Sequence, residues 1–174
     1  MRAWVFQDWA VNAGSPEHQV LLAWFRLAQW AVAHWGSLGR LVATPYQSFS
    51  ALFLGIELPV ALTVGPRLRL HHKSGIVING ESVIGCDCQL RHGITIGNKV
   101  DRAGQSLGAA TIGDDVEFGA GCVVIGDIHV GDHARIGAHA VVTKSVPPYA
   151  VVVGNPGRVI RIDNPQGRQE TRHH

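Results

Sequence analysis

The chain has 174 residues, of which 46% are hydrophobic and 16% charged, and its formal net charge is +2. This length fits one domain with a small appendage, and the apolar fraction is large enough to form a buried core. A charge so close to balance argues against a nucleic acid partner. The three cysteines, Cys86, Cys88 and Cys122, form neither a disulfide framework nor a zinc-ligand spacing, which favours a reducing, cytoplasmic compartment.

The N-terminus lacks the basic and then apolar pattern of a signal peptide. The longest apolar stretch, residues 20–33, is interrupted by Arg26 and Gln29, so we expect it to be too short and too polar to span a bilayer.

Residues 1–55 are expected to form a helical segment. Ser15-Pro16-Glu17 has the pattern of a helix start, and apolar residues then recur at helical spacing until Gly36. A second helix is expected from Thr44 to Gly55. All five tryptophans lie in this segment. Two interpretations remain open: a cap on the following domain, or a contact with another subunit or a membrane surface.

Residues 56–160 contain a six-residue repeat. From Ile78 to Ile96, and again from Ile112 to Val142, an aliphatic or aromatic residue returns every sixth position and glycine usually follows it. This period is the signature of a parallel β-helix, in which three hexapeptides make one coil of about 18 residues. We therefore predict a mainly β fold consisting of the helical segment, this coil and a polar tail over residues 161–174.

Two breaks interrupt the repeat. The register slips by two residues between Leu70 and Ile78, and residues 98–110 have no register at all. The second break predicts a loop that leaves the coil, and long loops on a rigid scaffold commonly carry function.

The position of each histidine relative to the repeat predicts which of the ten histidines could have a role. His72 and His92 each lie two positions after an inward leucine, so we predict that they stack on adjacent coils and face outward. His129, His133 and His139 are expected to be solvated turn residues. His18 and His34 fall on the helices, and His173 and His174 fall in the tail; none of these four is expected to have a role.

A histidine that acts as a general base needs a pKa near neutrality and a partner that fixes its tautomer. Glu57, one coil before His72, is the candidate partner. No serine or cysteine nucleophile stands out, which favours direct transfer to an acceptor over a covalent intermediate.

Several segments together resemble the serine acetyltransferase family of hexapeptide acyltransferases, and most closely its colanic acid and exopolysaccharide acetyltransferase branch. They are Gly55-Ile-Glu-Leu-Pro, Leu70-His-His-Lys-Ser-Gly-Ile-Val-Ile, Arg91-His-Gly-Ile-Thr-Ile-Gly-Asn, Phe118-Gly-Ala-Gly, Ile136-Gly-Ala and Val146-Pro-Pro. The resemblance covers residues 55–161. It implies a left-handed parallel β-helix and a homotrimer with active sites between neighbouring coils.

The resemblance also implies the roles of individual residues. His72 corresponds to the catalytic base and Glu57 to the aspartate that orients it. His71, Arg91 and His92 are expected to bind the acceptor or to assist the reaction. Acetyl-CoA would be the co-substrate, with no metal. Its expected contacts are Asn98, Lys99, Ala120 and Ala138 for the pantetheine chain and Arg135, Lys144 and Arg158 for the phosphates.

One departure concerns the acceptor. Serine acetyltransferases have an Arg-His pair that holds the serine carboxylate, where this chain has Gly108-Ala109-Ala110. We therefore expect a sugar hydroxyl in exopolysaccharide biosynthesis, free or lipid-linked, with serine as the alternative. Two alternatives from other classes are a zinc enzyme similar to the γ-class carbonic anhydrases, using His72, His92 and a neighbour's His129 or His133, and a non-catalytic scaffold.

Overall fold

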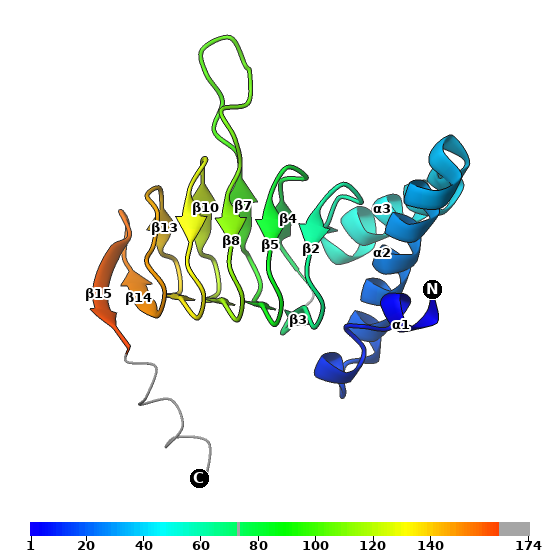
Figure 1. Cartoon of the computed structure of the whole chain (residues 1–174), viewed down its shortest axis with the longest axis horizontal. Coiled ribbons are helices and arrows are strands. Elements are labelled where there is room, and N and C mark those ends of the chain that lie inside the picture. Colours follow the sequence, from blue (N-terminus) through cyan, green and yellow to red (C-terminus); the bar gives the residue numbers. More distant parts are fainter. Residues whose placement is uncertain (73, 164–174) are drawn as a thin grey trace.

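The computed structural model describes residues 1–72 and 74–163. The helices lie at one end of the molecule, the β-strands stack away from them as a coil, and the last strands form the opposite end (Figure 1).

The helical segment contains more elements than the sequence predicted. They are α1 (Arg2–Val5), η1 (Ala10–Asn12), α2 (Pro16–Trp35), η2 (Gly36–Gly39), α3 (Arg40–Phe49) and the π-helical turn η3 (Ser50–Leu54).

Helix α2 has the predicted bounds, although the Ser15 side chain makes no capping hydrogen bond. The second helix begins at Arg40 and not at Thr44, so Pro45 lies inside it. The expectation that Pro45 marks the first turn was wrong because η2 leads directly into α3. Gly55 ends the segment in a left-handed conformation with φ 61°.

The coil consists of three sheets, which we call A, B and C. Sheet A contains β1 (Ile56–Glu57), β4 (Ile76–Ile78), β7 (Thr95–Gly97), β10 (Val123–Ile125) and β13 (Val141–Val142). Sheet B contains β2 (Thr63–Val64), β5 (Val83–Ile84), β8 (Thr111–Ile112) and β11 (His129–Val130). Sheet C contains β3 (Arg69–Leu70), β6 (Gln89–Leu90), β9 (Glu117–Phe118), β12 (Arg135–Ile136), β14 (Ala150–Val153) and β15 (Arg158–Ile162).

The order of the strands confirms a parallel β-helix. From β1 to β13 successive strands go to sheets A, B and C in turn, whereas β14 and β15 both join sheet C after an isolated parallel bridge between Val130 and Val146. Partners within a sheet are parallel apart from β15, which pairs antiparallel with β14. Every repeat therefore adds its inward side chain to one continuous core.

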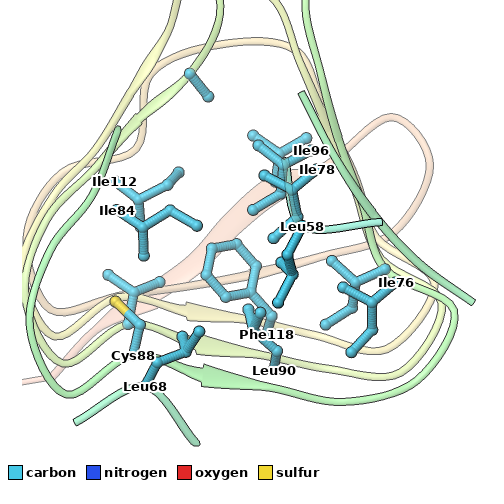
Figure 2. Close-up of a cluster of buried hydrophobic side chains, with 14 of the residues drawn as sticks. Leu58, Leu68, Ile76, Ile78, Ile84, Cys88, Leu90, Ile96, Ile112 and Phe118 are labelled. Atoms are coloured by element: carbon cyan, nitrogen blue, oxygen red, sulfur yellow. The ribbon is translucent and has the colours of Figure 1, made fainter. Parts of the chain in front are cut away.

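The core is made by the residues that the repeat predicted to face inward. Ile78, Ile96 and Phe118 are at most 2% exposed, and Figure 2 shows such side chains converging from the three sheets. Cys88 and Cys122 are also fully buried and belong to this core. Burial raises the pKa of both thiols to about 12, because the low-dielectric interior disfavours the thiolate.

The two-residue slip occurs where β3 leads into β4. Leu70 pairs with Leu90, twenty positions later, whereas Ile78 pairs with Ile96, eighteen positions later. The turn from sheet C to sheet A is therefore two residues longer in the first coil than in the second, and this longer turn contains His72.

The helices close the open edge of the first coil with polar side chains. Arg26 is buried, forms an ion pair with Asp8 at 2.8 Å and donates to the carbonyl oxygens of Val64 and Gly65. Asn12 accepts from the Leu70 N–H. Backbone N–H and C=O groups of the first coil that would otherwise lack a partner at this edge are therefore hydrogen-bonded to the helical segment.

The segment 98–110 projects from the coil as a long arm (Figure 1). It folds back on itself through an antiparallel bridge between Val100 and Ser106. Its base is held by the Asn98 side chain, which donates to Ser106 Oγ, and by Ser106, which donates to Glu81 at 2.6 Å.

At the other end of the coil, regular structure extends slightly beyond the predicted boundary at residue 160. Strand β15 reaches Ile162, and the Asp163 N–H donates to the Tyr149 carbonyl. His173 and His174 lie outside the described residues. Within residues 1–72 and 74–163, no helix has the length and apolarity needed to cross a membrane.

Candidate active site

Turns between the sheets form three corners, which we name by the sheets they join. The CA corner contains residues 71, 72, 74, 75, 91–93, 119–121 and 137–139. The BC corner contains residues 65–67, 85–87, 113–115, 131–133 and 147–149. The AB corner contains residues 59–61, 79–81, 98–110, 126–128 and 143–145.

Glycines allow the coils to stack closely at the CA corner. Gly75, Gly93 and Gly121 all have φ +69°, which favours glycine. A Cβ on Gly75 would lie 3.1 Å from the Gly93 Cα, and one on Gly93 would lie 3.4 Å from the Gly121 Cα. The residues that follow these glycines, Ile76, Ile94 and Cys122, are buried, whereas Ser74 and His92, which precede the first two, are exposed.

His72 and His92 meet at this corner, as predicted. Their ring centroids are 4.9 Å apart at an interplanar angle of 78°. Both side chains are exposed. Within the described part of the chain neither ring forms a hydrogen bond, so their nitrogens are available to a ligand. This geometry suits a proton-transferring group, while the catalytic role itself stays a prediction.

Glu57 lies on β1 in sheet A, in register with Val77. No hydrogen bond joins Glu57 to His72 among the described residues. The glutamate instead lines a cavity of about 170 Å³ between η3 and β1, together with Gln47 and Ser50. Its orienting role therefore stays a prediction that requires movement of a side chain or a bridging group.

His71 and Arg91 lie just before the two stacked histidines, at the margin of sheet C. His71 Nε2 is 3.0 Å from Gln89 Oε1. Both His71 and Arg91 line a cavity of about 120 Å³ whose other wall is formed by Glu117 and Arg135.

The residues expected to contact CoA fall into separate groups. Ala120 and Ala138 lie at the CA corner, beyond His92. Asn98, Lys99 and Lys144 lie at the AB corner, on the other side of sheet A. One chain therefore does not bring these groups together in a single groove.

The two remaining cations lie on sheet C. Arg135 is 3.7 Å from Glu117 and 3.8 Å from Asp163, so it is already partly neutralised. Arg158 is exposed on β15 and donates to the Gly157 carbonyl.

The BC corner contains a second column of polar side chains, which the sequence interpretation missed. Arg67 pairs with Asp87, and His133 Nδ1 lies 2.9 Å from Asp115 Oδ2 and stacks on Tyr149 with a centroid distance of 4.7 Å. The Arg67 guanidinium lowers the pKa of Asp87. His133 is thus a turn residue whose ring is hydrogen-bonded and stacked, and not freely solvated as we expected.

The repeat contained a signal for this column. Arg67, Asp87, Asp115, His133 and Tyr149 all have positive φ, between 52° and 62°, and all occupy the same position of the turn. Because aspartate tolerates this conformation better than most residues, the recurrence of aspartate at this repeat position was the available clue.

His139, also expected to be a solvated turn residue, belongs to the CA corner. It is exposed, but its ring lies over Gly121, where a Cβ would approach within 2.5 Å of the imidazole.

Residues 1–72 and 74–163 contain no cluster of three or more histidine, cysteine, aspartate or glutamate side chains arranged to hold a metal ion. His129 lies on sheet B and His133 at the BC corner, away from His72 and His92 at the CA corner.

Comparison with known proteins extends these observations. The family described as bacterial transferase hexapeptide (six repeats) matches residues 109–144. The chain is 39% identical to a serine acetyltransferase of Mycobacterium tuberculosis over 140 residues, covering 80% of this chain and 59% of that protein. It is 40% identical to the colanic acid biosynthesis acetyltransferase WcaB of Escherichia coli K12 over 126 residues, covering 70% of this chain and 76% of WcaB.

A solved structure shares the fold. A serine acetyltransferase in complex with CoA superimposes with a TM-score of 0.69 at 26% identity, covering 83% of this chain and 57% of that chain. The chain thus spans little more than half the length of the serine acetyltransferases it matches. Its repeat, its parallel coil and its similarity to WcaB over most of both chains lead to one conclusion: the chain belongs to the hexapeptide-repeat acetyltransferases related to serine acetyltransferase and WcaB.

Proposed function

We propose that the protein is an acetyl-CoA-dependent O-acetyltransferase that uses His72 as its general base. The observation that carries this proposal is the pair of exposed imidazoles of His72 and His92, whose ring centroids lie 4.9 Å apart at the CA corner. An imidazole accepts and returns a proton near neutral pH, which acyl transfer to a hydroxyl requires.

The reaction proceeds by direct transfer. His72 takes the proton of the acceptor hydroxyl, and the oxygen attacks the thioester carbonyl carbon. The carbon–sulfur bond then breaks, and the CoA thiolate receives the proton from His72. His92 binds the acceptor or stabilises the oxyanion. Glu57 orients His72 and favours its protonated form during the transfer.

We propose acetyl-CoA as the co-substrate and a homotrimer as the active assembly. The serine acetyltransferase whose structure contains CoA supports the co-substrate. The separation of the expected CoA contacts supports the assembly. If Ala120 and Ala138 bind the same CoA as Asn98 and Lys99, the two groups have to come from neighbouring chains. A left-handed coil is the form that this repeat family implies.

The acceptor in this proposal is a sugar hydroxyl in exopolysaccharide biosynthesis. It is supported by the similarity to WcaB and by Gly108, Ala109 and Ala110, which offer no cation to a serine carboxylate. Serine is the second candidate, supported by the serine acetyltransferase relatives.

We propose a cytoplasmic location, because the three cysteines Cys86, Cys88 and Cys122 are all free thiols. Exposed apolar side chains on η2, α3 and η3, such as Leu41 at 76% and Leu52 at 80% exposure, support a contact of these helices with another subunit or with the inner face of a membrane.

Thiol release from acetyl-CoA, measured with L-serine, nucleotide sugars and oligosaccharides, tests the proposal. We expect turnover with at least one sugar. Glu57→Gln should lower kcat but leave the KM for acetyl-CoA unchanged, because the glutamate acts through His72. Stoichiometric zinc in the purified protein would favour the zinc enzyme. An absence of acetyl-CoA binding in calorimetry would favour the scaffold.

A further inference from the structure

We propose that the acceptor carries an oxyanion, either a carboxylate or a phosphate, and that the guanidinium of Arg91 binds it beside His72. This inference rests on the proposed transferase function and adds the chemical class of the acceptor. Its starting point is the cavity of about 120 Å³ on sheet C that His71 and Arg91 line. Because His71 immediately precedes His72 and Arg91 immediately precedes His92, this cavity borders the turns that carry the two exposed histidines.

Of the two arginines that line the cavity, Arg135 has ion-pair partners among the described residues and Arg91 has none. Glu117 faces Arg135, whose Nε lies 3.7 Å away. Asp163 is paired with Arg161 at 2.7 Å and also faces Arg135. Arg91 is exposed, and within residues 1–72 and 74–163 it forms no hydrogen bond or ion pair. An acceptor with negative charge would therefore meet an unneutralised guanidinium here.

Two glycines of the neighbouring coils line the cavity together with Arg91. Leu90, Phe118 and Ile136 are in register, so the residue that follows each of them occupies the same place on successive coils. In the first coil of these three that residue is Arg91, but in the next two it is Gly119 and Gly137. A planar fork of N–H donors above bare backbone suits a carboxylate or a phosphate.

His71 adds a hydrogen-bond acceptor to the same cavity. Gln89 Oε1 can only accept, so a neutral His71 donates from Nε2 and keeps Nδ1 as an acceptor. The cavity thus offers a cation for an oxyanion and an acceptor for a nearby hydroxyl. This combination fits an acidic or phosphorylated sugar better than a neutral one.

Matched acceptors test the inference. Methyl glucuronide and methyl glucoside differ in a carboxylate, and glucose 1-phosphate provides a phosphate. We expect a higher kcat/KM for the two charged sugars. Arg91→Gln should raise their KM about 10- to 100-fold, the effect of losing a hydrogen bond to a charged group, and should leave the KM for methyl glucoside and acetyl-CoA unchanged. Arg91→Lys should be intermediate, because it keeps the charge and loses the fork.

Arg40→Gln is the control, since it removes an equal charge from the exposed surface of α3. Equal kcat/KM for charged and neutral sugars, or an Arg91→Gln effect on acetyl-CoA in place of the sugar, would overturn the inference. Calorimetry with the same sugars separates it from the proposed function. Binding of anionic sugars that depends on Arg91, without any thiol release, would sustain the inference and refute the transferase. Absence of such binding would refute the inference alone.

Discussion

The CA and BC corners belong to the same coil and carry polar side chains on successive turns, yet they use them differently. At the BC corner the left-handed position of each turn holds Arg67, Asp87, Asp115, His133 or Tyr149. All five make side-chain contacts within this column, in two hydrogen-bonded pairs and one ring stack. At the CA corner three of the equivalent positions are glycine, and the histidines beside them stay exposed.

This difference distinguishes a column whose side chains pair with one another from the column in which we propose that the reaction takes place. Polar side chains that are hydrogen-bonded to one another have few donors and acceptors left for a ligand. His72 and His92, by contrast, contact each other only through their rings. The glycines of the CA corner are part of the same arrangement, because a Cβ on Gly75 or Gly93 would press on the backbone of the next coil. Histidine content alone does not distinguish the corners, since each contains histidines.

The largest expected effect is the difference in kcat between the variants His72→Asn and His133→Asn. The first should lower kcat about 10²- to 10⁴-fold, the usual contribution of a positioned base, with little change in thermal stability. The second should leave kcat unchanged and reduce stability by no more than about 1 kcal/mol, because the pair with Asp115 is partly solvated. Steady-state kinetics and thermal unfolding measure both. Full activity of His72→Asn would contradict the assignment of the base.

Gly93→Ala tests whether glycine keeps the CA corner open. Because Gly93 has a φ of +69°, the alanine variant should be less stable by roughly 1–2 kcal/mol. The contact of the new Cβ with Gly121 should also displace His92 and lower kcat. Asp87→Gly makes the reverse change at the BC corner. It should remove the Arg67 pair without affecting kcat. Equal kinetic effects of the two variants would remove the distinction between the corners.

The two corners should not differ in how alkaline pH affects the free energy of unfolding, because each is followed by a buried thiol. Cys88 follows the BC corner and Cys122 follows the CA corner. Their folded pKa of about 12 lies above the ordinary thiol value. The unfolded chain therefore loses these protons first, and stability that is complete below about pH 8.5 should fall as pH rises toward 12, by about 1.4 kcal/mol per unit and thiol. Urea unfolding between pH 8 and 10 measures this slope, which should be smaller in Cys122→Ala.

The smallest expected effect concerns the exposed pair of Arg67 and Asp87. Because Arg67 lowers the pKa of Asp87, the pair contributes stability above the unfolded pKa of about 3.9 and loses it as pH falls through the lower folded value. Arg67→Gln should reduce the melting temperature by no more than about 4 °C at pH 7 and by less at pH 3. A larger loss at pH 3 than at pH 7 would show that the pair acts differently.

The six-residue period determined the coil, the inward residues and the projecting arm, because an inward aliphatic side chain at every turn leaves one way to bury them all. It also located His72 and His92 on neighbouring coils, since both are counted from inward leucines. Other features involve residues that are far apart in sequence. They are the closure of the first coil by Arg26 and Asn12 and the pairing at the BC corner. The tertiary structure alone decided these contacts, because each depends on which coil lies next to which. The same holds for the separation of the expected CoA contacts between two corners. The repeat specifies each turn but not which turns can reach one ligand.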